Sequence, residues 1–207
     1  RVFEDDIREY PVPSESNSVV IKRMGLKNAI NLWLKHLDLA SGEGINVEIE
    51  SSYGYKLTVD GRGLPAMGTG VSQVLPVIAL CLLTPEGGVA LLEEPELHLN
   101  PGIQQKLADF LLAISKSGRQ IIAETHSEYI VTRLRRRAAE NIENQDVFTF
   151  VFTENEANVG TTYRNVSPGD DGLINDWPRG FFDHVSTDVK ALLIKSAEIH
   201  GVKKPQK

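Results

Sequence analysis

An apolar strand that runs straight into adjacent carboxylates constrains this chain more than any other feature. Residues 89–93 read Val-Ala-Leu-Leu-Glu, and Glu94, Pro95 and a short polar loop follow them. A second apolar run, residues 121–123, leads into the sequence Glu-Thr-His-Ser, which contains His126. In an open α/β sheet, ligands bind at the carboxyl ends of the parallel strands. Two strands that deliver acids and a histidine to that edge therefore favour phosphate and magnesium chemistry.

The acids and the histidine can be given roles in phosphoryl transfer, which depends on positioning and charge neutralisation. On this interpretation Glu93 helps to hold Mg²⁺ through water, Glu94 is the general base or positions the attacking water, and His126 contacts the γ-phosphate. Three alternatives stay open: a solvated strand-to-loop junction, an ordinary capping role for His126, and a hydrolytic metal site. Such a metal site would use Glu93, Glu94, Glu96 and His98, although the chain has no His-Glu-x-x-His sequence.

The composition is that of an ordinary globular protein. The chain has 207 residues, of which 41% are hydrophobic and 24% charged, so it can bury a core as one large domain or two small ones. The net charge of −6 argues against nucleic-acid binding by bulk attraction, so any such contact needs a local basic patch. The single cysteine, Cys81, lies in an apolar run and is expected to be a reduced core residue.

The sequence indicates a cytoplasmic protein without a membrane partner. No apolar stretch approaches the ~20 residues that a membrane-spanning helix requires. The N-terminus has no signal-peptide pattern and no initiator methionine, which suggests a segment cut from something longer.

Hydrophobic spacing predicts an α/β fold in three regions. Residues 1–60 should contain a loop over 11–18, a helix from about Leu26 and a β-hairpin. The lobe over residues 61–166 should contain a strand–helix–strand unit, because Asn100 and Pro101 form a good helix start between the two apolar strands. This unit implies a parallel sheet.

Further elements complete the prediction. A helix over 128–140 should follow Ser127 as its cap, and residues 147–152 and 161–166 should form an antiparallel pair. Residues 167–207 form a small C-terminal extension with a helix over 188–200.

A glycine-rich segment precedes the acidic strand and opens a helix near Ser72. Backbone N–H groups and the helix dipole at such a position favour an anion. The candidate ligand-binding residues of this segment are Gly68, Thr69, Gly70, Ser72 and Gln73.

The order of these motifs resembles a known family. The chain has, in order, a glycine–serine–glutamine loop, an apolar helix, a strand ending in Glu-Glu-Pro-Glu, a helix and a strand ending in Glu-Thr-His-Ser. This order resembles the C-terminal half of the nucleotide-binding domain of ABC-type ATPases. The branch that it resembles includes SMC, RecF and OLD (overcoming lysogenization defect) proteins. A narrower resemblance is to prokaryotic AAA-type ATPases with a short C-terminal domain of unknown function, relatives of which occur in anti-phage defence. The strings that carry it are Gly-Val-Ser-Gln-Val-Leu-Pro, Glu-Pro-Glu-Leu-His-Leu-Asn-Pro, Glu-Thr-His-Ser-Glu and Trp-Pro-x-Gly-Phe-Phe-Asp. The resemblance covers about residues 20–190.

The resemblance implies a P-loop NTPase core that binds ATP and Mg²⁺ between two copies of the chain. The glycine-rich segment would be the signature loop, which closes over ATP held by the other subunit, and Glu93 the Walker B acid. Glu94 would be the catalytic glutamate and His126 the switch histidine. The D-loop, Glu96 to Asn100, would lie across the homodimer interface. An effector such as a nuclease is a possible further partner, although Toprim-type nuclease acids are not evident after residue 150.

Three departures from the family pattern matter. Glu93 stands where aspartate is usual, and the signature reads Thr-Gly-Val-Ser-Gln, which leaves open whether Thr69 or Ser72 touches the γ-phosphate. No Gly-x-x-x-x-Gly-Lys-Ser/Thr occurs in the chain, so the Walker A strand is missing. We therefore expect a preceding segment or a separate chain to complete the sheet and to be required for hydrolysis. The alternative is that the chain folds alone with an impaired site.

A basic run interrupts this acidic chain on the helix after His126. One interpretation is that this run contacts the phosphates of DNA through Arg133, Arg135, Arg136 and Arg137. The alternative is a solvated helix face paired with Glu140 and Glu143. The lysines near the C-terminus, Lys203, Lys204 and Lys207, are expected to form a soluble tail.

These inferences predict an ATPase head that dimerises around ATP and drives the action of a partner, with DNA maintenance or phage defence as its context. Two alternatives stay open on the same fold. One is a non-catalytic module that docks a partner protein, and the other is a DNA-binding module without ATPase activity.

Overall fold

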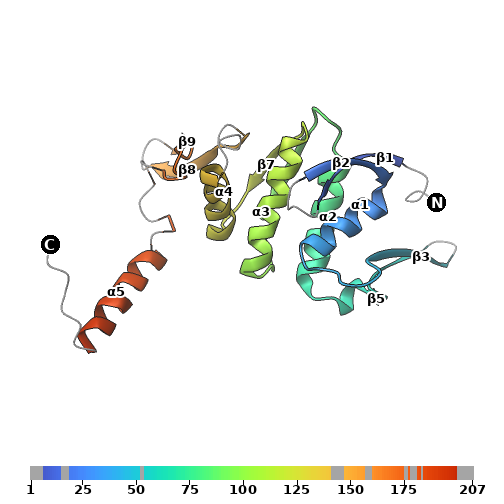
Figure 1. The fold of residues 1–207 in the computed structure, drawn as a ribbon, viewed down its shortest axis with the longest axis horizontal. Helices are drawn as coiled ribbons and strands as arrows, with labels where there is room; N and C mark the ends of the chain where they lie inside the picture. Colours follow the sequence, from blue (N-terminus) through green and yellow to red (C-terminus); the bar gives the residue numbers. More distant parts are fainter. Residues whose placement is uncertain are drawn as a thin grey trace.

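The computed structural model describes residues 7–14, 19–51, 54–140, 147–156, 160–174, 177, 181–182 and 184–199 (Figure 1). Along the chain the elements are β1 (Ile7–Pro13), β2 (Val19–Gly25), α1 (Leu26–His36), β3 (Ile45–Ser51), β4 (Gly54–Val59), β5 (Arg62–Gly63), η1 (Leu64–Ala66), α2 (Thr69–Leu83), β6 (Val89–Glu93), α3 (Pro101–Lys116), β7 (Gln120–Glu124), α4 (Glu128–Glu140), β8 (Phe150–Glu156), β9 (Gly160–Val166) and α5 (His184–Ile199). None of the helices in these ranges is long and apolar enough to cross a membrane.

The predicted strand–helix–strand unit is present as β6–α3–β7. The two strands are parallel, and their register pairs Val89 with Gln120 at one end and Glu93 with Glu124 at the other. Asn100 begins α3 as predicted, because its side-chain oxygen accepts a hydrogen bond from the backbone N–H of Ile103 at 3.0 Å. The parallel sheet that the sequence predicts is therefore confirmed, as is its connection through a helix.

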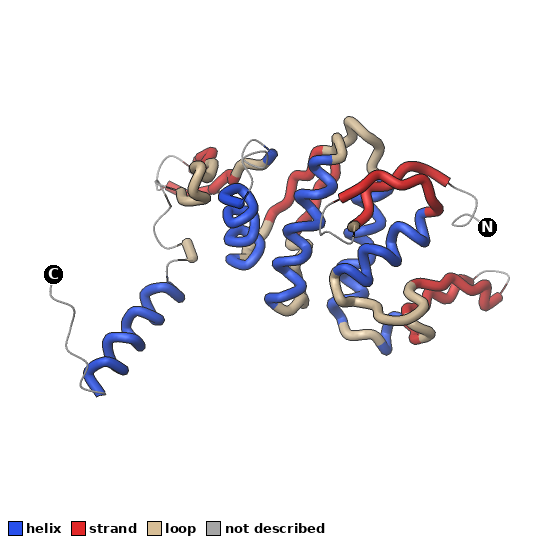
Figure 2. The backbone as a smooth tube through the Cα atoms, in the orientation of Figure 1, coloured by secondary structure: helices blue, strands red, loops and turns tan. Residues whose placement is uncertain are grey.

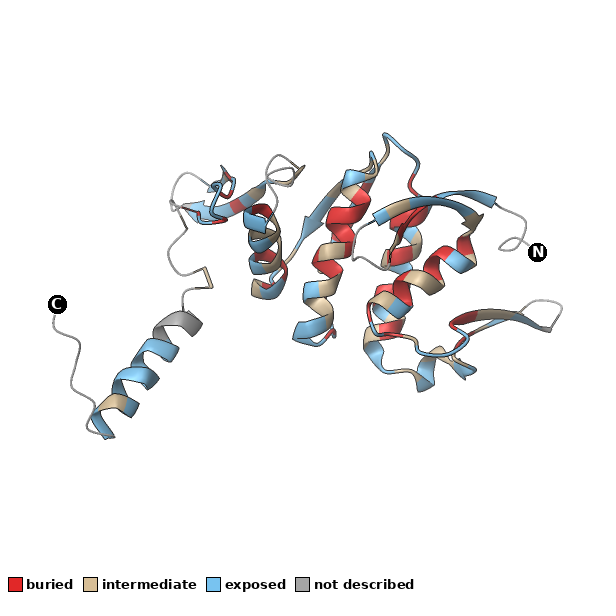
Figure 3. Cartoon of the chain, viewed as in Figure 1, coloured by how far each residue is buried: buried red, intermediate tan, exposed pale blue. Residues whose placement is uncertain are grey.

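The core lies between the N-terminal elements and α3. Its largest fully buried side chains include Trp33 of α1, Ile78 of α2 and Phe110 of α3. The rings of Trp33 and Phe110 meet edge to face, with 4.7 Å between their centroids. Figure 3 shows the buried residues concentrated on α1, α2 and α3. Cys81 is fully buried in this core, as predicted.

The predicted loop over residues 11–18 is wrong in its first part. Residues Ile7–Pro13 form β1, which pairs antiparallel with β2 in a two-stranded sheet. Prolines are tolerated there because β1 has one ladder partner, which leaves its other edge without ladder bonds to lose. Burial of Tyr10 and Val12, together with a 2.8 Å hydrogen bond from Nε1 of Trp33 to the carbonyl of Pro11, outweighs the local turn signal.

Other boundaries differ from the prediction by a few residues. The second predicted hairpin exists, but β8 begins at Phe150, and it pairs with β9. Helix α2 begins at Thr69 rather than near Ser72, so the glycine-rich segment lies partly inside the helix. The final helix begins earlier than predicted, at His184. The lysines of the predicted soluble tail lie outside the described residues.

Strands β8 and β9 lie beside α4 (Figures 1 and 2). Phe152, Val166 and Ile174 form a small buried cluster against which Trp177 packs. The guanidinium of Arg135 lies 5.0 Å from the centre of the Trp177 ring, and its Nε donates to the carbonyl of Gly172 at 2.9 Å. These contacts attach the extension to α4, whereas α5 extends away from the rest of the chain (Figure 1).

Candidate functional site

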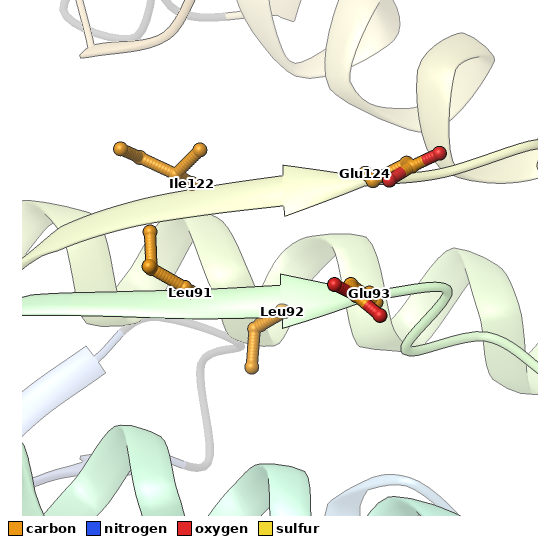
Figure 4. A pocket seen from close by; sticks show the side chains of 5 residues that line it. All are labelled: Leu91, Leu92, Glu93, Ile122 and Glu124. Atoms are coloured by element: carbon orange, nitrogen blue, oxygen red, sulfur yellow. The ribbon is translucent and has the colours of Figure 1, made fainter.

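The carboxyl ends of β6 and β7 place acidic residues side by side. Glu93 and Glu124 occupy paired positions in the register, and both are exposed. They line an open depression of about 470 Å³ together with Leu91, Leu92 and Ile122 (Figure 4). Carboxylate oxygens that face solvent at a strand end suit Mg²⁺, which binds through one or two carboxylates plus phosphate oxygens and water. The donor chemistry therefore fits the magnesium role predicted for Glu93.

Glu94 turns the chain away from the sheet. Its backbone adopts φ +41°, in the left-handed region that residues other than glycine rarely adopt. Its N–H donates to the carbonyl of Glu124 at 2.9 Å, which extends the β6–β7 ladder by one bond. Strained backbone of this kind recurs at functional sites, where the surrounding structure must hold it.

The turn brings Glu94 to His126. The Oε1 atom of Glu94 lies 3.5 Å from Nε2 of His126, although the two residues belong to different strand ends. The side chain of Glu94 is 43% exposed and that of His126 is 69% exposed, so both can be reached by a ligand. A carboxylate and an imidazole in contact at an accessible sheet edge can orient a water molecule or transfer a proton.

The side chain of Glu96 is buried, unlike those of Glu93 and Glu94. It is 7% exposed, and its Oε1 accepts hydrogen bonds from the hydroxyl of Thr125 at 2.6 Å and from the backbone N–H of His126 at 2.9 Å. The carboxylate is thus turned toward the His126 loop. Over the described residues, no three or more His, Cys, Asp or Glu side chains gather so as to hold a metal ion, so the alternative of a hydrolytic metal site with His98 finds no support.

The glycine-rich segment lies against the turn that follows β6. A Cβ on Gly70 would lie 3.1 Å from Cδ2 of Leu99 and 3.3 Å from the carbonyl oxygen of His98. Glycine allows this close approach. The structure therefore brings the predicted signature and D-loop segments of one chain together.

The two candidate hydroxyls of this segment differ in their surroundings. Ser72 Oγ donates to the carbonyl of Leu64 at 3.3 Å, whereas Thr69 is exposed in the first turn of α2. Gln73 and Gly68 are also exposed. Asn100 is exposed as well, but its side-chain oxygen is engaged as the α3 cap.

The predicted basic patch is largely engaged within the chain. Asp109 of α3 accepts hydrogen bonds from both Arg133 and Arg137, at 2.7 to 3.1 Å. Arg136 and Arg137 also bind Glu140, as the alternative interpretation predicted, while Glu143 lies outside the described residues.

Exposure separates these arginines. Arg136 is 62% exposed, whereas the side chains of Arg133 and Arg137 are less than a third exposed. Arg135 binds Gly172 and Trp177 as described above. DNA binding by the four arginines stays a prediction, and Arg136 is the most accessible of them.

Sequence reasoning gave no role to several residues that shape this site. These residues are Glu124, Thr125 and Gln104. The β6–β7 register could have indicated Glu124, because a parallel ladder places equivalent strand ends together. The contacts of Thr125 and Gln104 depend on tertiary structure, and no sequence pattern announces them.

Comparison with known proteins agrees with this geometry. The profile of a family described as "AAA domain, putative AbiEii toxin, Type IV TA system" matches residues 60–133, less than half of the chain. A chain from a solved structure described as "Structural biochemistry of ATP-driven dimerization and DNA stimulated activation of SMC ATPases" has a similar fold. The identity is 14% and the TM-score 0.50, and the match covers 80% of this chain and 91% of that chain. None of the curated proteins matches the sequence.

The two findings bear on different conclusions. At this identity the structural match shows the fold, which is that of the P-loop NTPases, with a parallel sheet and antiparallel additions. The family match spans the glycine-rich segment, β6, β7 and the start of α4, and it supports an ATP-binding, ATPase-type function.

Proposed function

We propose that this chain is part of an ATPase head that binds ATP and Mg²⁺ between two copies and hydrolyses the γ-phosphate bond. The observation that carries the proposal is the contact between Glu94 and His126 at the carboxyl edge of the parallel strands. That edge is where ligands bind in α/β sheets. The family match over residues 60–133 supports the same chemistry.

Each residue of the edge has a distinct task in this proposal. Glu94 orients the attacking water and accepts its proton, and His126 contacts the γ-phosphate through the exposed imidazole. Glu93 holds Mg²⁺, with Glu124 beside it as a second carboxylate. The ion, when bound, would neutralise charge on the phosphates.

The apolar face of β6 and β7 supports the need for a further segment. Leu91 is 68% exposed and Ile122 is 52% exposed on the side of the sheet that lines the depression (Figure 4). Parallel strands are normally covered on both faces. A strand and helix that carry the Walker A lysine would cover this face, complete the sheet and supply the phosphate-binding loop that the sequence lacks.

The second copy supplies the other half of the nucleotide site. In the proposed dimer, the signature segment faces ATP held by the partner copy, through Gly68, Thr69, Gly70, Ser72 and Gln73. Asn100 lies at the interface between the two copies. Because the hydroxyl of Ser72 is bonded to Leu64, we assign the γ-phosphate contact to Thr69. The structurally similar SMC protein is described in terms of ATP-driven dimerisation, which is the behaviour proposed for this chain.

DNA is the second candidate ligand, and it follows from one observation. Arg136 presents an exposed guanidinium on α4, the helix that begins directly after the His126 loop. The SMC protein is described as having DNA-stimulated activation, so stimulation by DNA is the form we propose. A defence-related effector such as a nuclease, and a cytoplasmic location, complete the proposal through the family resemblance.

The direct test is ATP turnover by the chain together with the segment that supplies the P-loop. Glu94→Gln should abolish turnover while ATP-dependent dimerisation persists, because the amide cannot accept the proton. Glu86→Gln is the matched control, since Glu86 is exposed at the opposite end of β6. Equal turnover in Glu94→Gln and the wild type would contradict the mechanism, and no turnover in either would favour the non-catalytic module that docks a partner protein.

A further inference from the structure

The buried carboxylate of Glu96 contacts the loop that carries His126. Its Oε1 accepts two hydrogen bonds, one from the Thr125 hydroxyl at 2.6 Å and one from the His126 backbone N–H at 2.9 Å. Glu96 belongs to the turn after β6, and His126 belongs to the loop after β7, so these bonds join two separate loops. Hydrogen bonds to a carboxylate are stronger than those between neutral groups.

The two bonds are part of a closed circuit. Thr125 Oγ1 accepts from the N–H of Ser127 at 3.1 Å, and Ser127 Oγ donates to the side-chain oxygen of Gln104 at 2.6 Å. The amide nitrogen of Gln104 donates to the carbonyl of Leu99 at 2.8 Å, and the N–H of Leu99 donates to the carbonyl of Glu96 at 3.0 Å. The circuit therefore fixes the turn, the start of α3 and the start of α4 relative to one another.

The reactive side chains have no comparable support from packing. Glu94 and His126 are both substantially exposed, so the positions of their backbones decide whether they meet. The N–H of Glu94 is held by Glu124, and the N–H of His126 is held by Glu96. The 3.5 Å approach between the two side chains thus rests on two backbone bonds, and the one at His126 belongs to the circuit.

Stability alone does not account for a glutamate at this position. The Oε2 atom of Glu96 is buried and has no hydrogen-bond partner among the described residues. An unsatisfied buried polar atom in a native structure calls for an explanation. The explanation we draw is that the carboxylate is buried for the sake of its other oxygen, Oε1, which accepts both hydrogen bonds from the His126 loop.

We infer that Glu96 is a positioning residue that holds the His126 loop against the Glu94 turn. Its effect on catalysis rests on the proposed function, whereas its effect on the loop does not. The two are therefore separated in the experiment.

The first measurement is amide hydrogen exchange by NMR on the 207-residue chain, without nucleotide. Glu96→Ala should speed exchange of the His126 N–H by about tenfold, because one hydrogen bond to a charged group is lost. Glu96→Gln keeps the acceptor oxygen and should restore protection. Thr125→Val, which removes the neighbouring donor and leaves the His126 bond, should have a smaller effect and guards against an unfolded alanine variant.

The second measurement is ATP turnover by the chain together with its P-loop segment. Glu96→Ala should lower kcat by about a hundredfold with little change in KM, because the catalytic groups are misplaced rather than removed. Glu96→Gln should keep most of the activity. Gln104→Ala should lower kcat, and Gln105→Ala, an exposed neighbour on α3, is the matched control that should not.

The outcomes are distinguishable. Unchanged exchange of the His126 N–H in a folded Glu96→Ala variant would overturn the inference, as would equal loss of protection in Glu96→Gln. Faster exchange with unchanged kcat would overturn the catalytic part. If Glu94→Gln also retains turnover, the proposed function fails, and the exchange experiment still decides whether Glu96 holds the loop.

Discussion

Gly70 lies against Leu99, so closely that a Cβ at position 70 would come within 3.1 Å of the leucine side chain. Helix propensity favours alanine over glycine by about 1 kcal/mol. Overpacking typically costs about 1–3 kcal/mol. We expect Gly70→Ala to lower the free energy of unfolding by about 1 kcal/mol, and Gly70→Val to lower it further. Denaturant titration would measure both, with Gly102→Ala in the first turn of α3 as the control, because a Cβ there would meet the side-chain oxygen of Asn100 at 3.4 Å. A more stable Gly70→Ala chain would contradict the proposed close contact.

Asp109 should be a major link between α3 and α4. It accepts bonds from Arg133 and Arg137, and all three side chains are less than a third exposed. Asp109→Ala leaves two partly buried guanidinium groups without their carboxylate, which should lower the free energy of unfolding by about 3 kcal/mol. Glu140→Ala, which removes a more exposed partner, should cost well under half as much. Chemical denaturation of the three proteins would test the order.

Asp109 should also make stability depend on acid. Burial raises its pKa, but the hydrogen bonds and charges of Arg137 and Arg133 outweigh burial, so the pKa lies below the ordinary value of 3.8. The folded state therefore binds a proton less readily than the unfolded state. The stabilisation is complete well above pH 3.8 and is lost as the pH falls through the lowered pKa of the folded state. Unfolding free energies measured from pH 6 down to pH 2 should show a smaller acid loss in Asp109→Asn than in the wild type.

Cys81 should be unreactive while the chain is folded. Burial raises the pKa of its thiol to about 12, with a smaller opposing effect from the charge of Arg119. Because the thiolate is the reactive form, a thiol reagent at pH 8 should modify the folded chain only as fast as it opens. The rate should rise to that of a free thiol in denaturant. Rapid labelling of native protein would contradict the burial.

The apolar face of β6 and β7 should tolerate charge in the isolated chain. Leu91 is 68% exposed, so Leu91→Glu should leave the free energy of unfolding nearly unchanged while preventing association with a P-loop segment. Leu92, 6% exposed on the other face, provides the comparison. Leu92→Glu should unfold the chain, because a charge would enter the core. Circular dichroism and a pull-down with the P-loop segment would separate these outcomes.

Secondary-structure elements could be predicted from the sequence where local chemistry and hydrophobic periodicity agree. The apolar runs before Glu93 and Glu124 predicted the parallel pair, and Asn100 predicted the start of α3. These elements position the site, so the contact of Glu94 with His126 follows from them. The P-loop NTPase fold itself was predicted from the resemblance of these motifs to a known family, and spacing alone predicted only an α/β chain with a parallel sheet.

Sequence reasoning failed where tertiary contacts decide. Burial of Tyr10 and Val12 made a strand of a segment whose prolines read as a loop. Asp109 engaged arginines that read as a basic patch, and its position opposite them depends on how α3 packs on α4. The burial of Glu96 likewise could not be read from a run of acids that looks uniformly exposed.

Helix α4 has His126 just before its first turn and Trp177 packed beside Arg135 further along. A helix of 13 residues spans about 20 Å, and its hydrogen-bonded backbone moves as a unit. Ser127 caps the start of this rod, because its Oγ accepts the N–H of Ile130 at 3.1 Å. A tilt of this rod by a few degrees at its Ser127 end would displace its other end, where Arg135 holds Gly172 and Trp177. If the His126 loop binds phosphate as proposed, the C-terminal extension is therefore mechanically connected to that loop through a single helix.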